Sequence, residues 1–358
     1  MNRIITVVGA RPQFIKAATL SRQFKLTGIE ELIIHTGQHF DSNMSEVFFN
    51  EMEIPTPAYQ LDIHGLTHGA MTGRMLEGIE SILLNEKPDG VLVYGDTNST
   101  LAGALAASKL HIPVIHVEAG LRSFNMEMPE EINRILTDRI SNVLFCPTNA
   151  AVNNLKSEGF ENMPVRIIKN GDVMQDAAIY YAAKAEQKSN ILKQVGLSEF
   201  VLATIHRQEN TDSPETLQQI IAGLNDINRR IPVLVPIHPR TRNILAQLDI
   251  LPEFKMIEPV GYFDMLMLLK SCELVITDSG GVQKEAFFFG KHCITLREQT
   301  EWVELVENGY NILVGSDRSK LIEAFQLSMN KISDFSVDLY GKGYAAETAV
   351  KELLSIYV

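Results

Sequence analysis

The sequence of 358 residues contains few cysteines, no excess of positive charge and no long apolar run. Its three cysteines, Cys146, Cys272 and Cys293, are odd in number, far apart and without metal-type spacing, so we expect buried, reduced thiols. A formal net charge of −12 excludes the basic face that nucleic acids and acidic membranes require. Because no run can span a bilayer and residues 1–9 predict a strand rather than a signal peptide, we expect a cytosolic protein.

The sequence also lacks the common signatures of metal and dinucleotide binding. Histidines are spaced four apart at His35/His39 and His64/His68, but only pairs on a helix would face one metal ion. His35 ends a predicted strand and Gly65 interrupts the second pair, so we expect no metal site. Neither Gly-x-Gly-x-x-Gly nor a Gly-Lys-Ser/Thr loop follows the first predicted strand, which argues against a tightly held dinucleotide and against ATP hydrolysis.

Short apolar runs alternate with helical patterns along the chain, which is typical of parallel α/β sheets. The first series of predicted strands covers residues 4–8, 31–35, 90–94, 114–117 and 143–146, and the second covers 200–205, 233–237, 255–257, 274–277, 292–296 and 312–314. Between the two series, residues 165–172 predict a last strand and turn. The length favours two domains of similar size, and we place the hinge at the predicted helix 177–188. Ligands of open parallel sheets bind beyond the carboxyl ends of the strands, so two facing sheets predict a central cleft.

The most informative segment is 273–285, where an apolar strand runs through Asp-Ser-Gly-Gly into a helix. Gly280 and Gly281 let the backbone turn tightly and approach a ligand, and Ser279 can cap the helix, whose free N–H groups face an incoming anion. One turn later, Glu285 offers a carboxylate that can accept hydrogen bonds from two adjacent hydroxyls, as on a ribose. The pattern predicts a site for a nucleoside diphosphate, and the alternative is a plain Ser-capped helix.

A second strand-to-helix turn, residues 9–16, carries two cations over the start of a helix. Pro12 is placed near the first helical position, and Arg11 and Lys16 are the two cations. This arrangement predicts a clamp for a phosphate or a carboxylate, and the alternative is a pair of surface charges.

Three acidic positions are predicted to meet at one edge of the first sheet. Asp96 follows the strand 90–94, Glu118 directly follows the strand 114–117, and Glu130 lies in the segment Met-Pro-Glu-Glu. Carboxylates at strand ends can remove and deliver protons, because burial and mutual repulsion can raise one pKa. The alternatives are a helix cap for Asp96 and a favourable first-turn position for Glu130.

Polar residues also follow the predicted strands of the second series. His206 and Arg207 follow the strand 200–205, His238 follows 233–237, and Arg297 follows 292–296. An imidazole and nearby arginines can stabilise a departing diphosphate. A lone histidine is more often structural, but His206 stands beside Arg, Glu and Asn at a strand end, which favours a functional role.

Five motifs taken in order resemble the non-hydrolysing UDP-N-acetylglucosamine 2-epimerases over nearly the whole chain: residues 9–16, 95–100, 116–122, 129–134 and 277–286. The resemblance implies an α/β fold of glycosyltransferase-B architecture, with two Rossmann-like domains facing a central cleft. The first would comprise residues 1–170 together with a C-terminal helix within 345–358, and the second, UDP-binding domain would comprise residues 171–344. A homodimer is also implied.

The same resemblance implies a reaction that needs no cofactor. A base removes the C2 proton of a UDP-sugar as UDP leaves C1, and UDP adds back to the resulting 2-acetamidoglucal after a proton reaches the opposite face. The motif match implies acid/base roles for Asp96, Glu118 and Glu130, with His206 near the diphosphate or the sugar. It further implies UDP contacts for Arg11, Ser279, Gly280, Gly281 and Glu285, with Lys16 assisting. We also expect His238 to contact UDP, and Gln13, Arg122, Arg207 and Arg297 to contact the substrate.

The chain departs from the common family pattern at two motifs. Where the family usually has Gly-Thr-Arg-Pro-Glu and Thr-Glu-Arg-Pro-Glu, this sequence has Ala10, Gln13 and Thr-Glu-Trp-Val-Glu at 300–304. These departures resemble the branch acting on UDP-2,3-diacetamido-2,3-dideoxy-glucuronic acid, because neutral Gln13 beside Arg11 and Lys16 leaves positive charge for a uronate. Two alternatives remain: a glycosyltransferase of the same fold, which would need an acceptor, and a nucleotide-sugar sensor, which would not need the three carboxylates.

Overall fold

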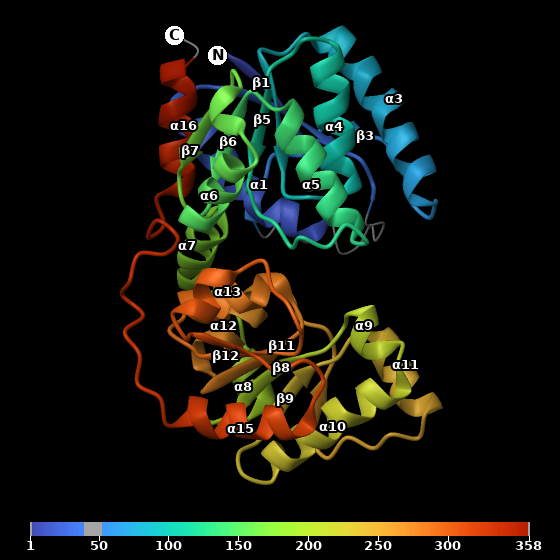
Figure 1. Ribbon diagram of the computed structural model, residues 1–358, viewed down its shortest axis with the longest axis vertical. Helices are drawn as coiled ribbons and strands as arrows, with labels where there is room; N and C mark the ends of the chain where they lie inside the picture. Colours follow the sequence, from blue (N-terminus) through green and yellow to red (C-terminus); the bar gives the residue numbers. More distant parts are fainter. Residues whose placement is uncertain (1, 39–51, 357–358) are drawn as a thin grey trace. The chain divides into compact units, whose positions relative to one another are not determined.

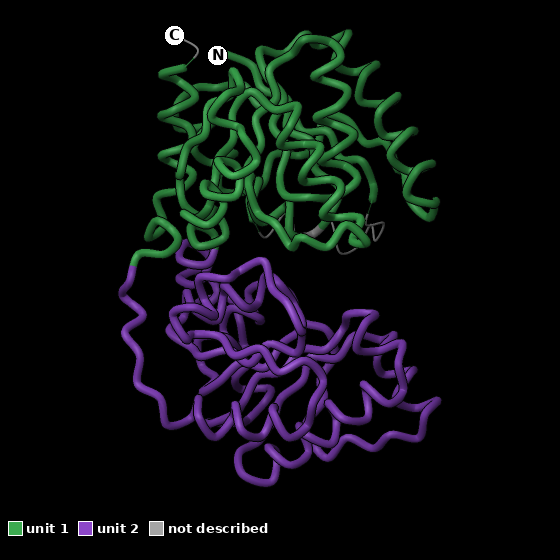
Figure 2. Tube along the Cα trace, in the orientation of Figure 1, with its two compact units in different colours: residues 1–177, 338–358 green, residues 178–337 purple. Residues whose placement is uncertain are grey.

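The computed structural model describes residues 2–38 and 52–356, except for the side chain of Arg11. The chain divides into two compact units, residues 1–177 with 338–358 and residues 178–337 (Figure 2). Each unit is an α/β structure built on a fully parallel sheet (Figure 1). Within the described residues, no helix combines the length and the apolar character needed to cross a membrane.

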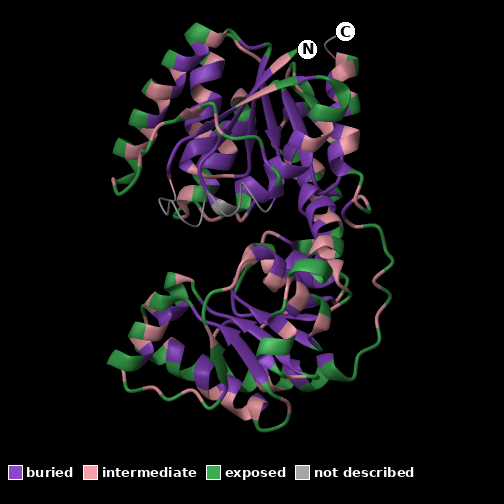
Figure 3. Ribbon diagram, turned by 180° about the vertical axis from the view of Figure 1, so that it is seen from behind, coloured by how far each residue is buried: buried purple, intermediate pink, exposed green. Residues whose placement is uncertain are grey.

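The first unit contains a seven-stranded sheet with the order β3-β2-β1-β4-β5-β6-β7. The strands are β1 (Arg3–Val8), β2 (Glu30–His35), β3 (Tyr59–Gln60), β4 (Gly90–Tyr94), β5 (Val114–Val117), β6 (Val143–Cys146) and β7 (Arg166–Lys169). Helices cover both faces of such a sheet, so the central strands β1, β4, β5 and β6 are almost entirely buried (Figure 3).

Seven α-helices and a short 3₁₀-helix surround this sheet among the described residues. They are α1 (Arg11–Thr27), α3 (His68–Glu86), α4 (Asn98–Lys109), α5 (Pro129–Ile140), α6 (Asn149–Ser157), η1 (Phe160–Asn162), the start of α7 (Val173–Lys188) and α16 (Ala345–Ile356). Helices α3 and α4 pack together over β1 and β4, and the C-terminal helix α16 packs against α1 (Figure 1).

The second unit contains a six-stranded sheet with the order β10-β9-β8-β11-β12-β13. Its strands are β8 (Val201–Thr204), β9 (Val233–Pro236), β10 (Lys255–Ile257), β11 (Leu274–Thr277), β12 (Cys293–Thr295) and β13 (Asn311–Leu313). Its helices are α8 (Ile191–Val195), α9 (Gln208–Thr211), α10 (Pro214–Asn228), α11 (Pro239–Gln247), α12 (Tyr262–Ser271), α13 (Gly280–Phe288), α14 (Val303–Glu307) and α15 (Arg318–Met329). Two apolar clusters, one on each side of the sheet, form its core.

The strand orders determine where each sheet can bind a ligand. In the first sheet the order reverses between β1 and β4, and in the second it reverses between β8 and β11. Open parallel sheets bind ligands outside the carboxyl ends of the strands at such reversal points. The segments that follow these four strands carry many of the predicted site residues, among them Lys16, Asp96, His206 and Ser279.

The α/β fold class is confirmed, and β4, β5, β6, β10 and β11 have the predicted bounds. Strand β3 was not predicted because its two residues give no apolar run. The three cysteines are free and buried, as predicted, and burial raises the pKa of the Cys272 and Cys293 thiols to about 12.

Candidate functional site

A pocket of about 190 Å³ lies in the first unit at the carboxyl ends of β1 and β4. The start of α1, the turn after β4 and the first residues of α5 line it. Gln13, Lys16, Asp96 and Glu130 are among these residues, so four of the predicted site residues meet around one cavity. Of the remaining predictions in this unit, the side chain of Arg11 lies outside the described part of the chain.

Lys16 and Glu118 form a buried ion pair beside this pocket, although 102 positions separate them in the sequence. Each side chain is only 9% exposed. Gly95 provides the space for the pair, because a Cβ at this position would lie 3.2 Å from Glu118 Oε2 and 3.3 Å from Lys16 Nζ. Its φ of +63° is also in the region that favours glycine. Lys16 therefore compensates the charge of a carboxylate here.

Glu118 itself has an unusual backbone conformation. Its φ is +72°, a left-handed value that costs free energy for a residue with a side chain. The N–H groups of Glu118 and Ala119 both donate to the carbonyl oxygen of Phe145, at 3.1 and 3.0 Å, so the neighbouring strand β6 holds the turn. Strained residues that the surrounding structure holds in place are concentrated at functional sites.

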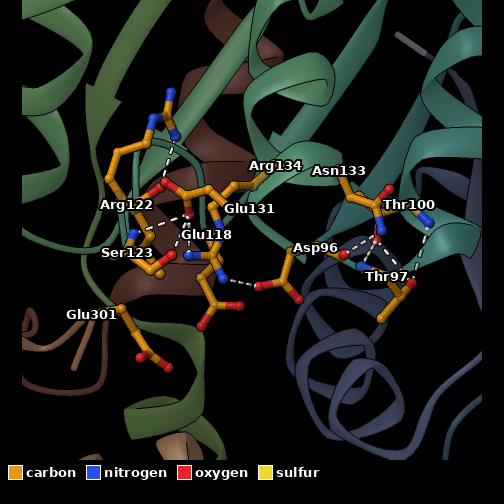
Figure 4. A network of polar contacts seen from close by, with 12 residues as sticks. Asp96, Thr97, Thr100, Glu118, Arg122, Ser123, Glu131, Asn133, Arg134 and Glu301 are labelled. Atoms are coloured by element: carbon orange, nitrogen blue, oxygen red, sulfur yellow. Dashed lines mark hydrogen bonds and ion pairs between the residues drawn. The ribbon is translucent and has the colours of Figure 1, made fainter. Parts of the chain in front are cut away.

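Asp96 is bound from the side of helix α5. The Arg134 guanidinium forms an ion pair with the Asp96 carboxylate, and it also donates to Glu131 Oε2 at 2.9 Å (Figure 4). Glu131 is completely buried and accepts 2.9 Å hydrogen bonds from the backbone N–H groups of Ser123 and Phe124. The Glu131 carboxylate and the Arg134 guanidinium thus connect the loop after β5, helix α5 and the turn after β4.

Glu130 occupies the first turn of α5, where its exposed carboxylate interacts favourably with the helix dipole. Three residues later, Asn133 donates to the Asp96 carbonyl at 2.9 Å and to Asn98 Oδ1 at 3.2 Å. Helix α5 therefore presents Glu130 to the pocket while Asn133 fixes the helix against the turn that carries Asp96.

Gln13 is buried, with an exposed fraction of 1%, and all of its hydrogen-bonding groups contact protein. Its Oε1 accepts from the N–H groups of Gly9 and Ala10 at 2.8 and 3.0 Å, which caps the start of α1. Its Nε2 donates to the Tyr94 carbonyl at 2.9 Å and to two threonine hydroxyls of the β4–α4 turn. The predicted substrate contact of Gln13 is therefore at most indirect.

Arg122 does not point into the pocket, contrary to the expectation that it contacts substrate. Only 3% of the residue is exposed. Its guanidinium binds both oxygens of Glu158 at 2.6 and 2.9 Å and Asp138 Oδ2 at 2.7 Å. The sequence did not reveal this role, because Glu158 is 36 residues away and no local pattern relates the two.

In the second unit, Asp278 organises the segment that follows β8. Its Oδ2 accepts from the backbone N–H groups of His206 and Arg207, both at 2.9 Å, and His206 Nδ1 lies 2.9 Å from Oδ1. Burial alone would raise the pKa of Asp278, but the hydrogen bond and charge of His206 lower it below the usual value. The His206 side chain is 49% exposed, so Asp278 orients an accessible imidazole.

Helix α13 begins two residues after Asp278, at the predicted anion site. Ser279 is the N-cap residue by its backbone, but its hydroxyl makes no capping hydrogen bond, so the predicted side-chain cap is absent. A Cβ at Gly281 would meet no atom within 4 Å, and its φ is not positive. Among the described residues, neither packing nor backbone conformation therefore requires a glycine at 281. Glu285 lies one turn further and is 5% exposed.

The other predicted residues of this unit have separate positions. His238 is exposed and its Nδ1 accepts from the backbone N–H of Arg240 at 3.2 Å, which caps α11. Arg297 is 7% exposed and forms an ion pair with Glu301, with 2.9 Å between Nη1 and Oε2. Arg207 is half-buried, and its backbone is fixed by the Asp278 carboxylate described above.

Comparisons with known proteins agree with one another. A sequence model of the UDP-N-acetylglucosamine 2-epimerase family matches residues 23–354. The UDP-2,3-diacetamido-2,3-dideoxy-D-glucuronate 2-epimerase of Pseudomonas aeruginosa is 56% identical over 99% of this chain and 100% of its own length. The UDP-GlcNAc 2-epimerase of Methanocaldococcus jannaschii, solved in complex with UDP-GlcNAc and UDP, is 45% identical, covers 99% of both chains and has a TM-score of 0.90. A Neisseria meningitidis UDP-GlcNAc 2-epimerase structure is 31% identical over 99% of this chain and 100% of its own, with a TM-score of 0.88.

Proposed function

The chain belongs to the UDP-N-acetylglucosamine 2-epimerase family and is a UDP-sugar 2-epimerase, and we propose that its substrate is UDP-2,3-diacetamido-2,3-dideoxy-D-glucuronate. The 56% identity to the Pseudomonas aeruginosa enzyme, over the full length of that protein, supports this substrate. Asp96 and Glu130 line the pocket of the first unit, and Glu118 forms the ion pair with Lys16 beside it. This arrangement of three carboxylates is the observation that carries the mechanism.

The proposed reaction is elimination followed by re-addition. The C2 hydrogen of the sugar is not next to a carbonyl, so simple proton removal would leave an unstabilised carbanion. If a carboxylate takes this proton as the C1–O bond breaks, the electron pair forms a C1=C2 double bond and UDP leaves with the electrons of the C–O bond. A proton then reaches C2 on the opposite face, and UDP adds back to C1, which gives the C2 epimer and regenerates all groups.

The three carboxylates supply the proton transfers in this proposal. Asp96 follows β4, Glu118 follows β5 and Glu130 lies in the first turn of α5, so they can reach a sugar from different directions. Lys16 compensates the charge of Glu118. Without such a cation, several carboxylates in a small pocket would repel one another and the anionic substrate.

The second unit supplies the proposed UDP site. The N–H groups at the start of α13 suit a diphosphate, and Gly281 allows the backbone to approach it closely. Glu285 would accept hydrogen bonds from the ribose hydroxyls, while His206, held by Asp278, would stabilise the charge on the departing diphosphate. Arg11 and His238 are proposed as further contacts of UDP, and Arg207 and Arg297 as contacts of the sugar.

Neutral Gln13 supports the choice of a uronate substrate. It lines the pocket that also contains Asp96 and Glu130, and its amide is fully hydrogen-bonded within the protein. A glutamate at this position would add a third negative charge to the lining and could not donate to the Tyr94 carbonyl. The sugar carboxylate of a uronate is tolerated better without that charge.

The test is proton NMR in deuterium oxide with two substrates in separate samples, UDP-N-acetylglucosamine and UDP-2,3-diacetamido-2,3-dideoxy-D-glucuronate, and no acceptor. We expect C2 inversion and deuterium at C2 with the uronate. Turnover of UDP-N-acetylglucosamine alone would refute the proposed substrate, and deuterium in neither would refute the elimination mechanism. Turnover without acceptor also separates an epimerase from a glycosyltransferase.

A matched pair of variants tests the carboxylates in the same assay. Glu118→Gln should lower the rate of deuterium uptake by about 100- to 10,000-fold, the usual contribution of a general acid or base. Glu127→Gln changes an exposed glutamate in the segment between β5 and α5 and should leave the rate unchanged. Equal rates for the two variants would remove Glu118 from the mechanism.

We also propose that the protein works in the cytosol as a homodimer. The three buried, unpaired thiols suit a reducing compartment. Sedimentation velocity of the purified protein tests the dimer, and a single species of monomer mass would refute it.

A further inference from the structure

A cluster of buried charged side chains contacts the residues on both sides of Glu118 in the sequence. Asp138, in the last turn of α5, is completely buried. Its Oδ1 lies 2.7 Å from His116 Nδ1, and its Oδ2 accepts from Arg122 Nη1 at 2.7 Å and from the Gly120 N–H at 3.1 Å. The proposed chemistry assigns no role to this carboxylate.

His116 is enclosed between two acceptors. Besides its contact with Asp138, its Nε2 lies 2.7 Å from the carbonyl oxygen of Gly95. A carbonyl oxygen only accepts hydrogen bonds, so Nε2 must carry a proton. Burial alone would raise the pKa of Asp138, but the hydrogen bonds and charges of His116 and Arg122 hold it below its usual value. The His116 ring is therefore held between the Asp138 carboxylate at Nδ1 and the Gly95 carbonyl oxygen at Nε2.

The contacts of Asp138 surround Glu118 in the sequence. His116 precedes Glu118 by two residues, and Gly120 and Arg122 follow it by two and four. Between these contacts Glu118 has its left-handed φ of +72°. A carboxylate that binds the chain on both sides of one residue can hold that residue in a conformation that it would otherwise leave.

The same cluster reaches the turn that carries Asp96. The Gly95 carbonyl accepts from His116, and the Gly95 N–H donates to the Val117 carbonyl at 3.0 Å. The residue before Asp96 is therefore bound through both its carbonyl and its N–H to β5, the strand that directly precedes Glu118. A movement of the His116 ring would therefore change the position of Glu118 relative to Asp96.

We propose that Asp138 is a positioning residue for the epimerase reaction: through His116, Gly120 and Arg122 it fixes the backbone conformation of Glu118 and the distance between Glu118 and Asp96. The inference rests on the proposed acid/base roles of these two carboxylates. Asp138 contacts neither substrate nor the reacting atoms, so its effect is on the chemical step and not on binding of UDP.

The test compares Asp138→Asn with Asp89→Asn. The asparagine keeps the size of Asp138 but presents an N–H₂ group or an uncharged oxygen to its donors, which displaces the His116 ring. A misplacement of about 1 Å at reacting groups costs about 100-fold in rate, so we expect kcat for deuterium uptake to fall about 100-fold. The Kd for UDP, measured by calorimetry, and the KM should stay near the wild-type values. Asp89 also accepts from two backbone N–H groups, at 2.6 and 3.0 Å, but before β4 at the opposite end of the strand, and its variant should keep kcat.

The outcomes separate this proposal from the proposed function. If the wild-type protein shows no deuterium uptake, the proposed reaction is wrong; if the wild-type protein turns over and Asp138→Asn keeps its kcat, the positioning role is wrong. Loss of UDP binding together with kcat would also overturn it, because it would show a general structural defect.

Discussion

Replacing Lys16 with methionine should destabilise the first unit much more than a typical change of a charged residue. The Lys16 and Glu118 side chains are each 9% exposed, so Lys16→Met removes one cation from the buried Glu118 carboxylate. Breaking a buried ion pair by removal of one partner costs about 3–5 kcal/mol. In a unit of this size, that loss corresponds to a decrease in Tm of roughly 6–20 °C.

Thermal and denaturant unfolding followed by circular dichroism measure this effect, with two further variants as comparison. Lys351→Met removes the partner of Glu347 on α16, a pair whose side chains are 72% and 43% exposed, and should cost less than about 0.5 kcal/mol. The double variant Lys16→Met/Glu118→Gln removes both charges and should recover most of the lost free energy, because the buried carboxylate that loses its Lys16 partner is removed as well. A loss for Lys16→Met no larger than for Lys351→Met would refute the reasoning, as would purely additive effects in the double variant.

Three further changes test other parts of the structure. Gly281→Ala should keep or slightly raise stability, because its Cβ meets no atom, but should weaken UDP binding measured by calorimetry at least about tenfold; unchanged affinity would remove this helix start from the proposed site. Gly9→Ala should cost about 1–3 kcal/mol in denaturant unfolding, since its Cβ would overlap the Thr36 hydroxyl, and a neutral effect would contradict this packing. The pKa of Asp278 is lowered in the folded state, so its stabilising contribution is complete above its unfolded pKa of about 3.9 and is lost as pH falls through the folded value. Asp278→Asn should therefore reduce the acid dependence of unfolding, and an unchanged pH profile would contradict the pairing with His206.

The sequence was sufficient for the strands and for the residues that follow them. Apolar runs such as 90–94 and 114–117 are short, uninterrupted and ended by polar residues, so their bounds are visible without a structure. Because parallel strands end at the same edge of a sheet, Asp96 and Glu118 could be predicted to lie near each other. Lys16 follows strand β1 of the same sheet, and it does lie beside Asp96 in the pocket.

What the sequence could not show is which polar groups pair with each other. Lys16 was predicted to bind an external anion, yet its partner in the structure is a carboxylate of its own chain, 102 residues away. Arg122, in the motif 116–122, was predicted to contact the substrate, but its guanidinium binds Asp138 and Glu158. Such pairings depend on how helices pack on the sheet, which local patterns do not encode.

The elimination mechanism is tested most directly by positional isotope exchange with substrate labelled with ¹⁸O in the bond between sugar C1 and the β-phosphate. If UDP leaves C1, its β-phosphate can rotate before re-addition, so ¹⁸O in recovered UDP-2,3-diacetamido-2,3-dideoxy-D-glucuronate should appear in non-bridging positions during epimerisation. Retention of all the label in the bridging position while C2 inverts would contradict C1–O cleavage with release of a rotating UDP.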